Sequence, residues 1–386
     1  MFDIRLKPVS GLVSKKDNFT DDQWGKQVFV YEDGDLNLEE FDIAIVGIEE
    51  ERASVANEGC SQAPDAIRSE LFKLHLNNSN FKVVDLGNIE PGHSIKDTYF
   101  GLASLLYELL KSNTTTIILG GSHDLTYAQY IAYQELYELV NLVVIDEKID
   151  VEEVKDHNMR SDSYLLPIFM HQPNILFNYC HLGYQKYLTH EKAVEIMDGL
   201  SFEFHRLGEV RGNLENVEPY IRNADLLSLD MSSVRSSDSP GHKSATPNGF
   251  YAEEVCQIAQ YAGYSDLLTT FGIYEMNPLF DKRDQSAQLA SQIIWHFVEG
   301  FYNRKGDLPG KNNEQFLKYI VKFDDMDHSI IFWKSKISDR WWMELPYGDN
   351  EKFSRQQIIP CSYQDYLRAC KEELPDRWMK AYQKLV

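Results

Sequence analysis

A chain of 386 residues is long enough for one α/β domain of about 300 residues with an appendage, or for two domains of ordinary size. Its 38 Lys and Arg face 60 Asp and Glu, and the formal charge of -22 argues against nucleic acid or an anionic membrane surface as a partner. The N-terminal sequence MFDIRLKPVS lacks a signal-peptide core, and no apolar run approaches the roughly 18 residues of a membrane span, so a cytoplasmic location is expected.

Residues 1–40 are interpreted as an N-terminal extension, and an alternating pattern begins at residue 41 and continues to about residue 303. Short apolar runs are the first half of this pattern: FDIAIVGI (41–48), KVVDLG (82–87), TTTIILGG (114–121), NLVVID (141–146), ADLLSLD (224–230) and LLTTFGIYE (267–275). Helical periodicity between them predicts helices over 63–74, 124–139, 252–262 and 290–301. This alternation predicts a three-layer α/β/α domain with a mostly parallel sheet.

The composition changes after residue 303. The polar stretch NRKGDLPGKNN indicates a linker over 304–314, and residues 315–386 are rich in aromatic side chains, including Trp333, Trp341, Trp342 and Trp378. Such tryptophans are more typical of a core or a subunit interface than of a ligand cage. We therefore expect an ordered C-terminal appendage that packs on the main domain or on a neighbouring subunit.

Acidic residues and a histidine follow four of the predicted strands. A single acid at a strand end is usually a helix cap or a solvated turn, but ligands in an open α/β sheet collect beyond the carboxyl ends of the strands. Residues of metal-binding type at four successive strand ends favour a site there, and they are His123, Asp146, Asp150, Asp230 and Glu275.

The segments that carry these residues resemble motifs of the arginase (ureohydrolase) superfamily. GGSHDLTY resembles G-G-D-H, VVIDEKIDV resembles D-A-H-x-D, LLSLDMSS resembles S-x-D-x-D, and FGIYEMNP resembles the E-x-N-P segment. Upstream, VGIEEERASVANEGCSQAPDAIR resembles the opening strand and the N-x-G-x-x-x-A-P-x-x-I-R signature. SPGHKSATPNGF resembles the loop after the last aspartate pair, in a form nearest to formimidoylglutamases. Together the motifs span about residues 41–303 in the family's order.

The resemblance implies a site for two Mn²⁺ ions whose bridging hydroxide attacks a guanidinium or amidine carbon. Four ligand positions match the family: His123, Asp146, Asp150 and Asp230. Two do not, because Lys148 stands where the family has His and Ser232 stands where it has Asp. In the family these two positions hold the second ion alone.

A protonated lysine has no lone pair for a metal but can hydrogen-bond carboxylates. The Lys148 ammonium is therefore predicted to replace the second cation, which gives at most one Mn²⁺ per chain. Three carboxylates then face one divalent ion and one ammonium, and the charges balance. A metal-free site held together by salt bridges to Lys148 remains the alternative.

Further departures concern the surroundings of the site. Ser122 replaces the family's Asp just before the histidine, with Asp124 on the other side, and Arg235 replaces a downstream Asp. His157 lies in the loop where relatives bind substrate, and is interpreted either as a proton shuttle or as an exposed loop residue. Glu275 matches the carboxylate that clamps the cationic nitrogen of the substrate; a strand-end acid in a local ion pair is the alternative.

Two classes of function remain open. In the first, the protein is a hydrolase of a linear amidine or guanidino C–N bond, with formimidoylglutamate or a guanidino acid as substrate. Its catalytic residues would be Asp150 and Glu275, with Lys148 giving electrostatic stabilisation at a one-metal site. In the second, it is a catalytically inactive pseudoenzyme with a binding, assembly or regulatory role. The resemblance implies a homo-oligomer in either case.

Overall fold

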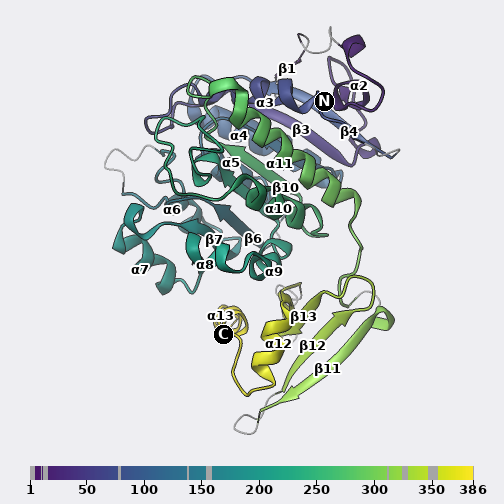
Figure 1. The fold of residues 1–386 in the computed structure, drawn as a ribbon, viewed down its shortest axis with the longest axis vertical. Coiled ribbons are helices and arrows are strands. Elements are labelled where there is room, and N and C mark those ends of the chain that lie inside the picture. Colours follow the sequence, from purple (N-terminus) through teal and green to yellow (C-terminus); the bar gives the residue numbers. More distant parts are fainter. Residues whose placement is uncertain are drawn as a thin grey trace.

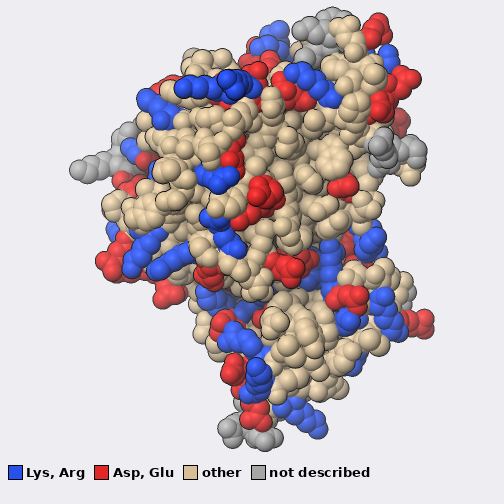
Figure 2. Space-filling model, in the orientation of Figure 1, with Lys and Arg blue, Asp and Glu red and all other residues tan. Residues whose placement is uncertain are grey.

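A computed structural model of the protein describes residues 5–9, 11, 16–76, 80–136, 139–153, 159–310, 313–323, 329–346 and 355–385. A ten-stranded sheet flanked by helices forms the larger part, and a four-stranded sheet near the C-terminus forms the smaller part (Figure 1). No helix among these residues combines the length and the apolar character that crossing a bilayer requires. On the face drawn in Figure 2, acidic and basic side chains are interspersed rather than gathered into one patch.

The large sheet has the order β1-β4-β3-β5-β10-β9-β6-β7-β8, with β2 also paired to β4. All of its strand pairs are parallel except that of β1 with β4. The strands are β1 (Leu6–Lys7), β2 (Phe29–Val30), β3 (Ile43–Ile48), β4 (Val83–Ile89), β5 (Thr115–Leu119), β6 (Val140–Ile145), β7 (Leu176–Tyr184), β8 (Glu203–Arg206), β9 (Leu226–Asp230) and β10 (Thr270–Tyr274). The predicted mostly parallel sheet is confirmed.

Helices cover both faces of this sheet. The helices of the large part are α2 (Trp24–Gln27), α3 (Ala63–Leu71), α4 (Ile95–Lys111), α5 (Leu125–Ile131), α6 (Leu165–Phe169), α7 (Glu191–Gly199), α8 (Leu207–Gly212), α9 (Glu218–Arg222), α10 (Ala252–Gly263) and α11 (Gln285–Tyr302). One hydrophobic core joins α3, α10 and α11 to one face, and a second joins α4, α5, α6 and α7 to the other. The α/β/α layering is therefore also confirmed.

The helix expected over 124–139 is shorter than predicted. It ends at Ile131, and a separate 3₁₀ turn, η4 (Gln134–Leu136), follows. The Tyr133 hydroxyl lies 2.7 Å from Thr269 Oγ1 and donates to the Asp225 carbonyl at 3.1 Å. These bonds tie the chain to the sheet just after the helix ends.

The C-terminal sheet is antiparallel, with the order β11-β12-β13-β14. Its strands are β11 (Phe316–Lys322), β12 (Ser329–Ser335), β13 (Trp341–Glu344) and β14 (Ile358–Cys361), and the helices α12 (Tyr363–Ala369) and α13 (Asp376–Gln383) follow. The four tryptophans of the appendage, Trp333, Trp341 and Trp342 in the sheet and Trp378 in α13, are buried. Trp341 and Trp378 belong to a core that also includes Phe177 of β7, so this sheet and the large domain share apolar packing.

Candidate metal centre

The carboxyl ends of β5, β6, β9 and β10 meet at one edge of the large sheet, and the candidate residues follow them. His123 lies after a turn in which Gly120 and Gly121 have φ of 74° and 79°. A Cβ on Gly121 would lie 2.7 Å from the Glu50 carbonyl oxygen, so the close approach requires glycine. This turn carries the imidazole toward the aspartates that follow β6 and β9.

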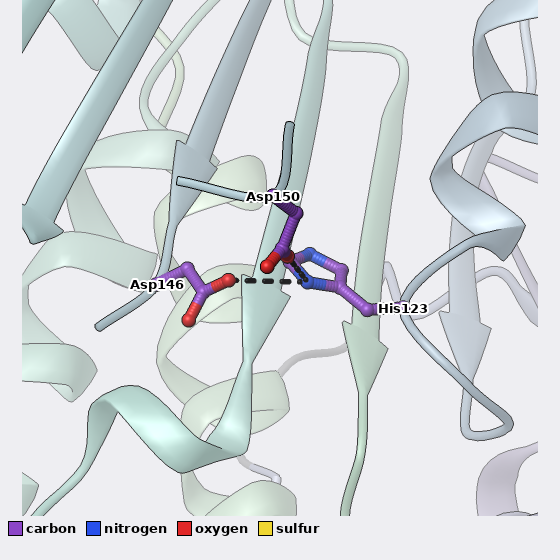
Figure 3. Close-up of side chains that lie close together, drawn as sticks. All are labelled: His123, Asp146 and Asp150. Atoms are coloured by element: carbon purple, nitrogen blue, oxygen red, sulfur yellow. Dashed lines mark ion pairs between the residues drawn. The ribbon is translucent and has the colours of Figure 1, made fainter. Parts of the chain in front are cut away.

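The Nδ1 atom of His123 faces three carboxylates. It lies 3.4 Å from Asp146 Oδ2, 3.4 Å from Asp150 Oδ2 and 3.3 Å from Asp230 Oδ2. Figure 3 shows the side chains of Asp146 and Asp150 converging on the imidazole. All four residues are buried. The structure therefore brings together the four residues that were predicted as metal ligands.

The ligand atoms of His123, Asp146 and Asp150 lie within 4.8 Å of one another, close enough for a single divalent ion, and Asp230 faces the same nitrogen. Nδ1 is buried and has no hydrogen-bond partner within the described residues. Neighbouring ligands of an ion bound at about 2.1–2.2 Å lie roughly 3.0–3.6 Å apart, and the distances from Nδ1 to the three carboxylates fall within that range. One imidazole nitrogen and three carboxylate oxygens form a donor set that suits manganese.

The buried carboxylates around His123 favour a positive charge at the centre. Burial alone lowers the pKa of His123, but the three aspartates outweigh it and raise that pKa well above its usual range. Burial and the charges of Asp150 and Asp230 raise the pKa of Asp146 well above normal. Without a cation the group gains protons, and a bound metal ion would relieve the same repulsion.

The far side of the imidazole is also held. His123 Nε2 lies 2.9 Å from Ser228 Oγ and 3.2 Å from the Tyr164 hydroxyl. When Nε2–H donates to Ser228, Nδ1 keeps the lone pair that a metal needs. Tyr164 was not singled out in the sequence, and Ser228 entered only as the first position of the S-x-D-x-D motif, with no role assigned to it.

The sequence predicted the Lys148 ammonium among the three carboxylates, and this prediction is wrong. The Nζ atom of Lys148 is 3.5 Å from Glu147 Oε1, and among the described residues no ion pair within 4 Å joins it to the three aspartates. Glu147 is buried, and its own pairing with the ammonium draws the lysine aside. The ammonium therefore lies beside the metal centre, where it still adds positive charge.

Backbone amides occupy the outer oxygens of two of the aspartates. The amide of Lys148 donates to Asp146 Oδ1 at 3.2 Å, and the amide of Ser232 donates to Asp230 Oδ1 at 2.6 Å. These are the oxygens that point away from His123. The two aspartates that bridge both ions in the family thus have one oxygen each engaged by the protein itself.

Glu275 borders the same centre from the end of β10. Its Oε1 accepts the His123 backbone N–H at 3.0 Å, and its Oε2 accepts Asn57 Nδ2 at 2.7 Å. Glu275 has φ of 61°, an uncommon value for a non-glycine residue, and Asn57 Nδ2 also donates to its carbonyl at 2.9 Å. Burial raises the pKa of Glu275 to about 8.

A cavity of about 300 Å³ opens onto these carboxylates. Its wall includes all the aspartates of the centre together with Glu275, Lys148, Ser232 and His242. His242 was not predicted, since it stands in a loop that the sequence placed in the family without assigning a role to each residue. Its Nδ1 accepts the Ser244 N–H at 3.0 Å, and its Nε2 lies 4.0 Å from Glu275 Oε2.

Other candidate positions lie apart from the metal ligands. Asp124 does not take over the role of the family's missing aspartate, because its carboxylate accepts the Tyr99 hydroxyl. Ser122 is buried, and Arg235 forms an ion pair with Asp238 at 2.8 Å. His157 lies outside the described residues.

Comparison with known proteins agrees with this geometry. The model of the family described as "Arginase family" matches residues 41–299. Formimidoylglutamase of Staphylococcus haemolyticus is 25% identical over 262 residues, which cover 65% of this chain and 82% of the relative. Formimidoylglutamase of Staphylococcus aureus MRSA252 is 25% identical over 270 residues, covering 67% and 86%.

Two solved structures share the fold. Trypanosoma cruzi formiminoglutamase, solved with Mn²⁺, superposes with a TM-score of 0.65 at 22% identity and covers 70% of this chain and 97% of that one. Formimidoylglutamase of Bacillus subtilis gives a TM-score of 0.64 at 19% identity, covering 71% and 90%. With its family model matched over most of its length and the ligand residues gathered at the expected strand ends, this chain belongs to the arginase family.

Proposed function

We propose that the protein hydrolyses the C–N bond of a linear amidine or guanidino acid, such as formimidoylglutamate, at a centre that holds at most one Mn²⁺. The proposal rests on His123 Nδ1, which is buried and has no hydrogen-bond partner among the described residues. This nitrogen faces three carboxylate oxygens at 3.3–3.4 Å, beside an open cavity. The formimidoylglutamases among its relatives support this substrate class.

In this proposal His123 and the three aspartates hold the ion. A Mn²⁺ ion bound there would supply Lewis acidity, which lowers the pKa of water toward neutrality. Asp150 accepts the proton of the attacking water, and Glu275 accepts N–H bonds from the amidinium group of the substrate. Lys148, paired with Glu147 on the cavity wall, lowers the negative potential around the reacting carbon.

The limit of one ion follows from positions 148 and 232, which hold the second ion in the family. Lys148 and Ser232 offer no metal ligand of the family's type there. Their backbone amides also occupy Asp146 Oδ1 and Asp230 Oδ1, so a second ion would have to displace both bonds.

The test combines metal content with turnover. Protein reconstituted with MnCl₂ should contain at most one Mn²⁺ per chain and convert N-formimidoyl-L-glutamate and water to L-glutamate and formamide. Glu275→Gln should keep the metal and lose turnover by about a hundredfold or more, whereas Asp230→Asn should lose the metal. Asp284→Asn, an exposed acid before α11, should behave like the parent.

Each other outcome has a definite meaning. Two ions at full occupancy would contradict the one-metal centre. One ion without hydrolysis of formimidoyl or guanidino acids would favour the alternative, a pseudoenzyme that keeps the fold and a metal for binding or assembly. This alternative is tested because positions 148 and 232 lack the metal ligands that the family has there.

A further inference from the structure

The chain between β9 and α10 brings a histidine, His242, into the wall of the metal cavity. The backbone on both sides of this residue is held in place. The Gly241 carbonyl accepts the Asn277 amide at 2.6 Å, and the Lys243 amide donates to Asn57 Oδ1 at 3.1 Å. The position of the imidazole is therefore set by the fold, and the proposed reaction assigns this residue no role.

Hydrogen bonding also fixes where the His242 ring carries its proton. Nδ1 accepts the Ser244 amide at 3.0 Å, so Nδ1 presents its lone pair and a neutral ring carries the proton on Nε2. Burial, the largest influence, and the charge of Lys148 lower the pKa of His242, and together they outweigh the opposite effect of Asp230. His242 is therefore a neutral hydrogen-bond donor at Nε2.

This N–H group is available to a ligand. Among the described residues Nε2 of His242 has no hydrogen-bond partner, and unlike Nδ1 of His123 it is not sealed from solvent, so it opens onto the cavity. Glu275 Oε2 lies 4.0 Å from Nε2, which is too far for a hydrogen bond between the two. One ligand can therefore contact His242 and Glu275 at the same time.

Asn57 holds these two groups in one arrangement. Its Nδ2 donates to Glu275 Oε2 at 2.7 Å and to the Glu275 carbonyl at 2.9 Å. Its Oδ1 accepts the amide of Lys243, the residue after His242, and its side chain is buried. Because one side chain bonds to both segments, the spacing between the His242 donor and the Glu275 carboxylate is set before a ligand binds.

That spacing favours a ligand whose two recognised groups are close together. The inference rests on the proposed function in one respect, because there Glu275 accepts N–H bonds from the amidinium group. A nitrogen on Glu275 and an oxygen on His242 would then lie roughly 3–5 Å apart. With bonds of about 1.5 Å, a carboxylate on the carbon next to the amidine nitrogen meets this distance, whereas one placed three methylenes away in an extended chain lies roughly 6 Å or more away.

The charge of Lys148 favours a carboxylate as the acceptor. Lys148 lines the same cavity and is partly exposed, and its positive charge reaches His242. An anion that accepts the His242 N–H therefore lies in the field of a cation, which offsets part of the repulsion from the aspartates of the metal centre.

We propose that His242 is a specificity-determining residue, whose Nε2–H donates to a substrate carboxylate on the carbon that also bears the amidine nitrogen, while Glu275 holds the amidinium. N-formimidoyl and N-amidino α-amino acids have this arrangement. Guanidino acids with several methylenes between the two groups do not. The structure thus narrows the proposed substrate class to acids substituted at the α-nitrogen.

The test compares the binding of guanidinoacetate, 4-guanidinobutyrate and methylguanidine to the full-length protein treated with MnCl₂, by isothermal titration calorimetry. The parent should bind guanidinoacetate at least about tenfold more tightly than either of the others. His242→Ala should reduce this preference to less than about threefold and leave methylguanidine binding unchanged, which also shows that the variant is folded. His242→Gln keeps a side-chain N–H and should retain a preference of about fivefold or more.

His190→Ala is the matched control, since His190 lines the same cavity but is exposed and pairs with Glu152 at 3.3 Å. It should change the preference by less than about threefold. The proposal is overturned if 4-guanidinobutyrate or methylguanidine binds the parent as tightly as guanidinoacetate, or if none of the three binds at about 10 mM. It is also overturned if His242→Ala keeps the preference, or if His242→Gln loses it as completely as His242→Ala.

The outcome for His242 is separate from the outcome for hydrolysis, because it is read from binding. Selective binding of guanidinoacetate that depends on His242, without hydrolysis of guanidinoacetate or N-formimidoyl-L-glutamate, would support the role of His242 and contradict the proposed function. Hydrolysis without the preference would do the reverse.

Discussion

Asp146 and Asp230 each present one carboxylate oxygen to His123 and give the other to a backbone amide two residues further along the chain. In this arrangement the side chains at positions 148 and 232 decide whether a second ion finds ligands, while the main chain there competes with that ion. Lys148 adds a charge that repels it.

Restoring the family's residues should therefore open the second position. We expect Lys148→His with Ser232→Asp to raise the Mn²⁺ content from at most one toward two per chain, as measured by elemental analysis. Each single change should do less, since Lys148→His removes a positive charge beside the aspartates and Ser232→Asp adds a negative one, so the effects should be non-additive. If the double variant folds but binds no more Mn²⁺ than the parent, the amide bonds or a closed cavity exclude the second ion.

Ser228 should control the affinity of the first position. Ser228→Ala removes the oxygen that faces His123 Nε2 at 2.9 Å, which frees the imidazole to rotate and to change tautomer. Loss of such a partner typically weakens metal binding about 10- to 100-fold, and a competition titration with a chelator measures it. Ser291→Ala is the control, because the hydroxyl of this buried serine donates to the Gln288 carbonyl in α11. Equal affinities in both variants would contradict the role of Ser228.

Much of the metal centre was predictable because parallel strands end at a common edge and the ligand types stand just after them. The direction of the Lys148 side chain was not predictable, because it depends on Glu147, and the sequence pattern does not reveal that Glu147 is buried. His242 was missed for a related reason: its place in the cavity wall depends on the path of a loop.

At the scale of elements, six apolar runs in the sequence became β3, β4, β5, β6, β9 and β10. These strands are buried along their whole length, and burial on both faces produces continuous apolar runs. β7 and β8 went unpredicted, because Asn178 and His181 interrupt the run in β7 and β8 is short and polar. Polar residues in these strands form hydrogen bonds within the fold. His181, for example, bonds to the Tyr179 hydroxyl and to the Asp146 carbonyl.

Glu50 joins the end of β3 to α4 and should make stability depend on pH. It accepts Arg52 Nε at 2.9 Å and Thr98 Oγ1 at 2.7 Å. Burial by itself raises the pKa of Glu50, but these bonds outweigh it and hold that pKa below its usual value. A lowered pKa in the folded state means that the stabilisation is present above the unfolded value of about 4.3 and is lost as the pH falls through the folded value.

Glu50→Gln should therefore reduce the free energy of unfolding by about 1–3 kcal/mol at pH 7. The difference from the parent should shrink as the pH drops below about 4, as followed by urea denaturation at a series of pH values. Glu58→Gln, at an exposed acid 3.6 Å from Lys243, should change stability by less than about 0.5 kcal/mol throughout. A Glu50→Gln difference that stays constant with pH would show that the carboxylate charge does not matter.

At the scale of the whole molecule, the appendage is joined to the large domain by buried polar contacts as well as apolar packing. Lys384 of the appendage lies 3.5 Å from Glu203 of β8, and its Nζ also donates to Asn178 Oδ1. Composition marked the change of character after residue 303, but not these contacts. In the sequence Arg222 and Lys384 resemble ordinary charged residues of helix ends, and only the three-dimensional packing buries Arg222 and covers most of the Lys384 side chain.

Arg222, at the end of α9, is the residue on which this attachment should depend most. Its Nη2 donates to the carbonyls of Trp341 at 3.1 Å and Cys361 at 3.3 Å, and its guanidinium carbon lies 4.3 Å from the Trp342 ring. Arg222→Leu removes both hydrogen bonds and the cation–π contact, a loss of roughly 2 kcal/mol or more.

Hydrogen exchange measured by mass spectrometry should then be at least about tenfold faster in β13 and β14 of Arg222→Leu, because the local opening of the appendage becomes more populated. Exchange in β5, at the centre of the large sheet, should remain as in the parent. Arg283→Leu, at an exposed residue before α11, should leave exchange unchanged in both sheets. Equal acceleration in β5 and β14 would mean that the variant weakens the whole fold, and no acceleration in either would mean that apolar packing alone holds the appendage in place.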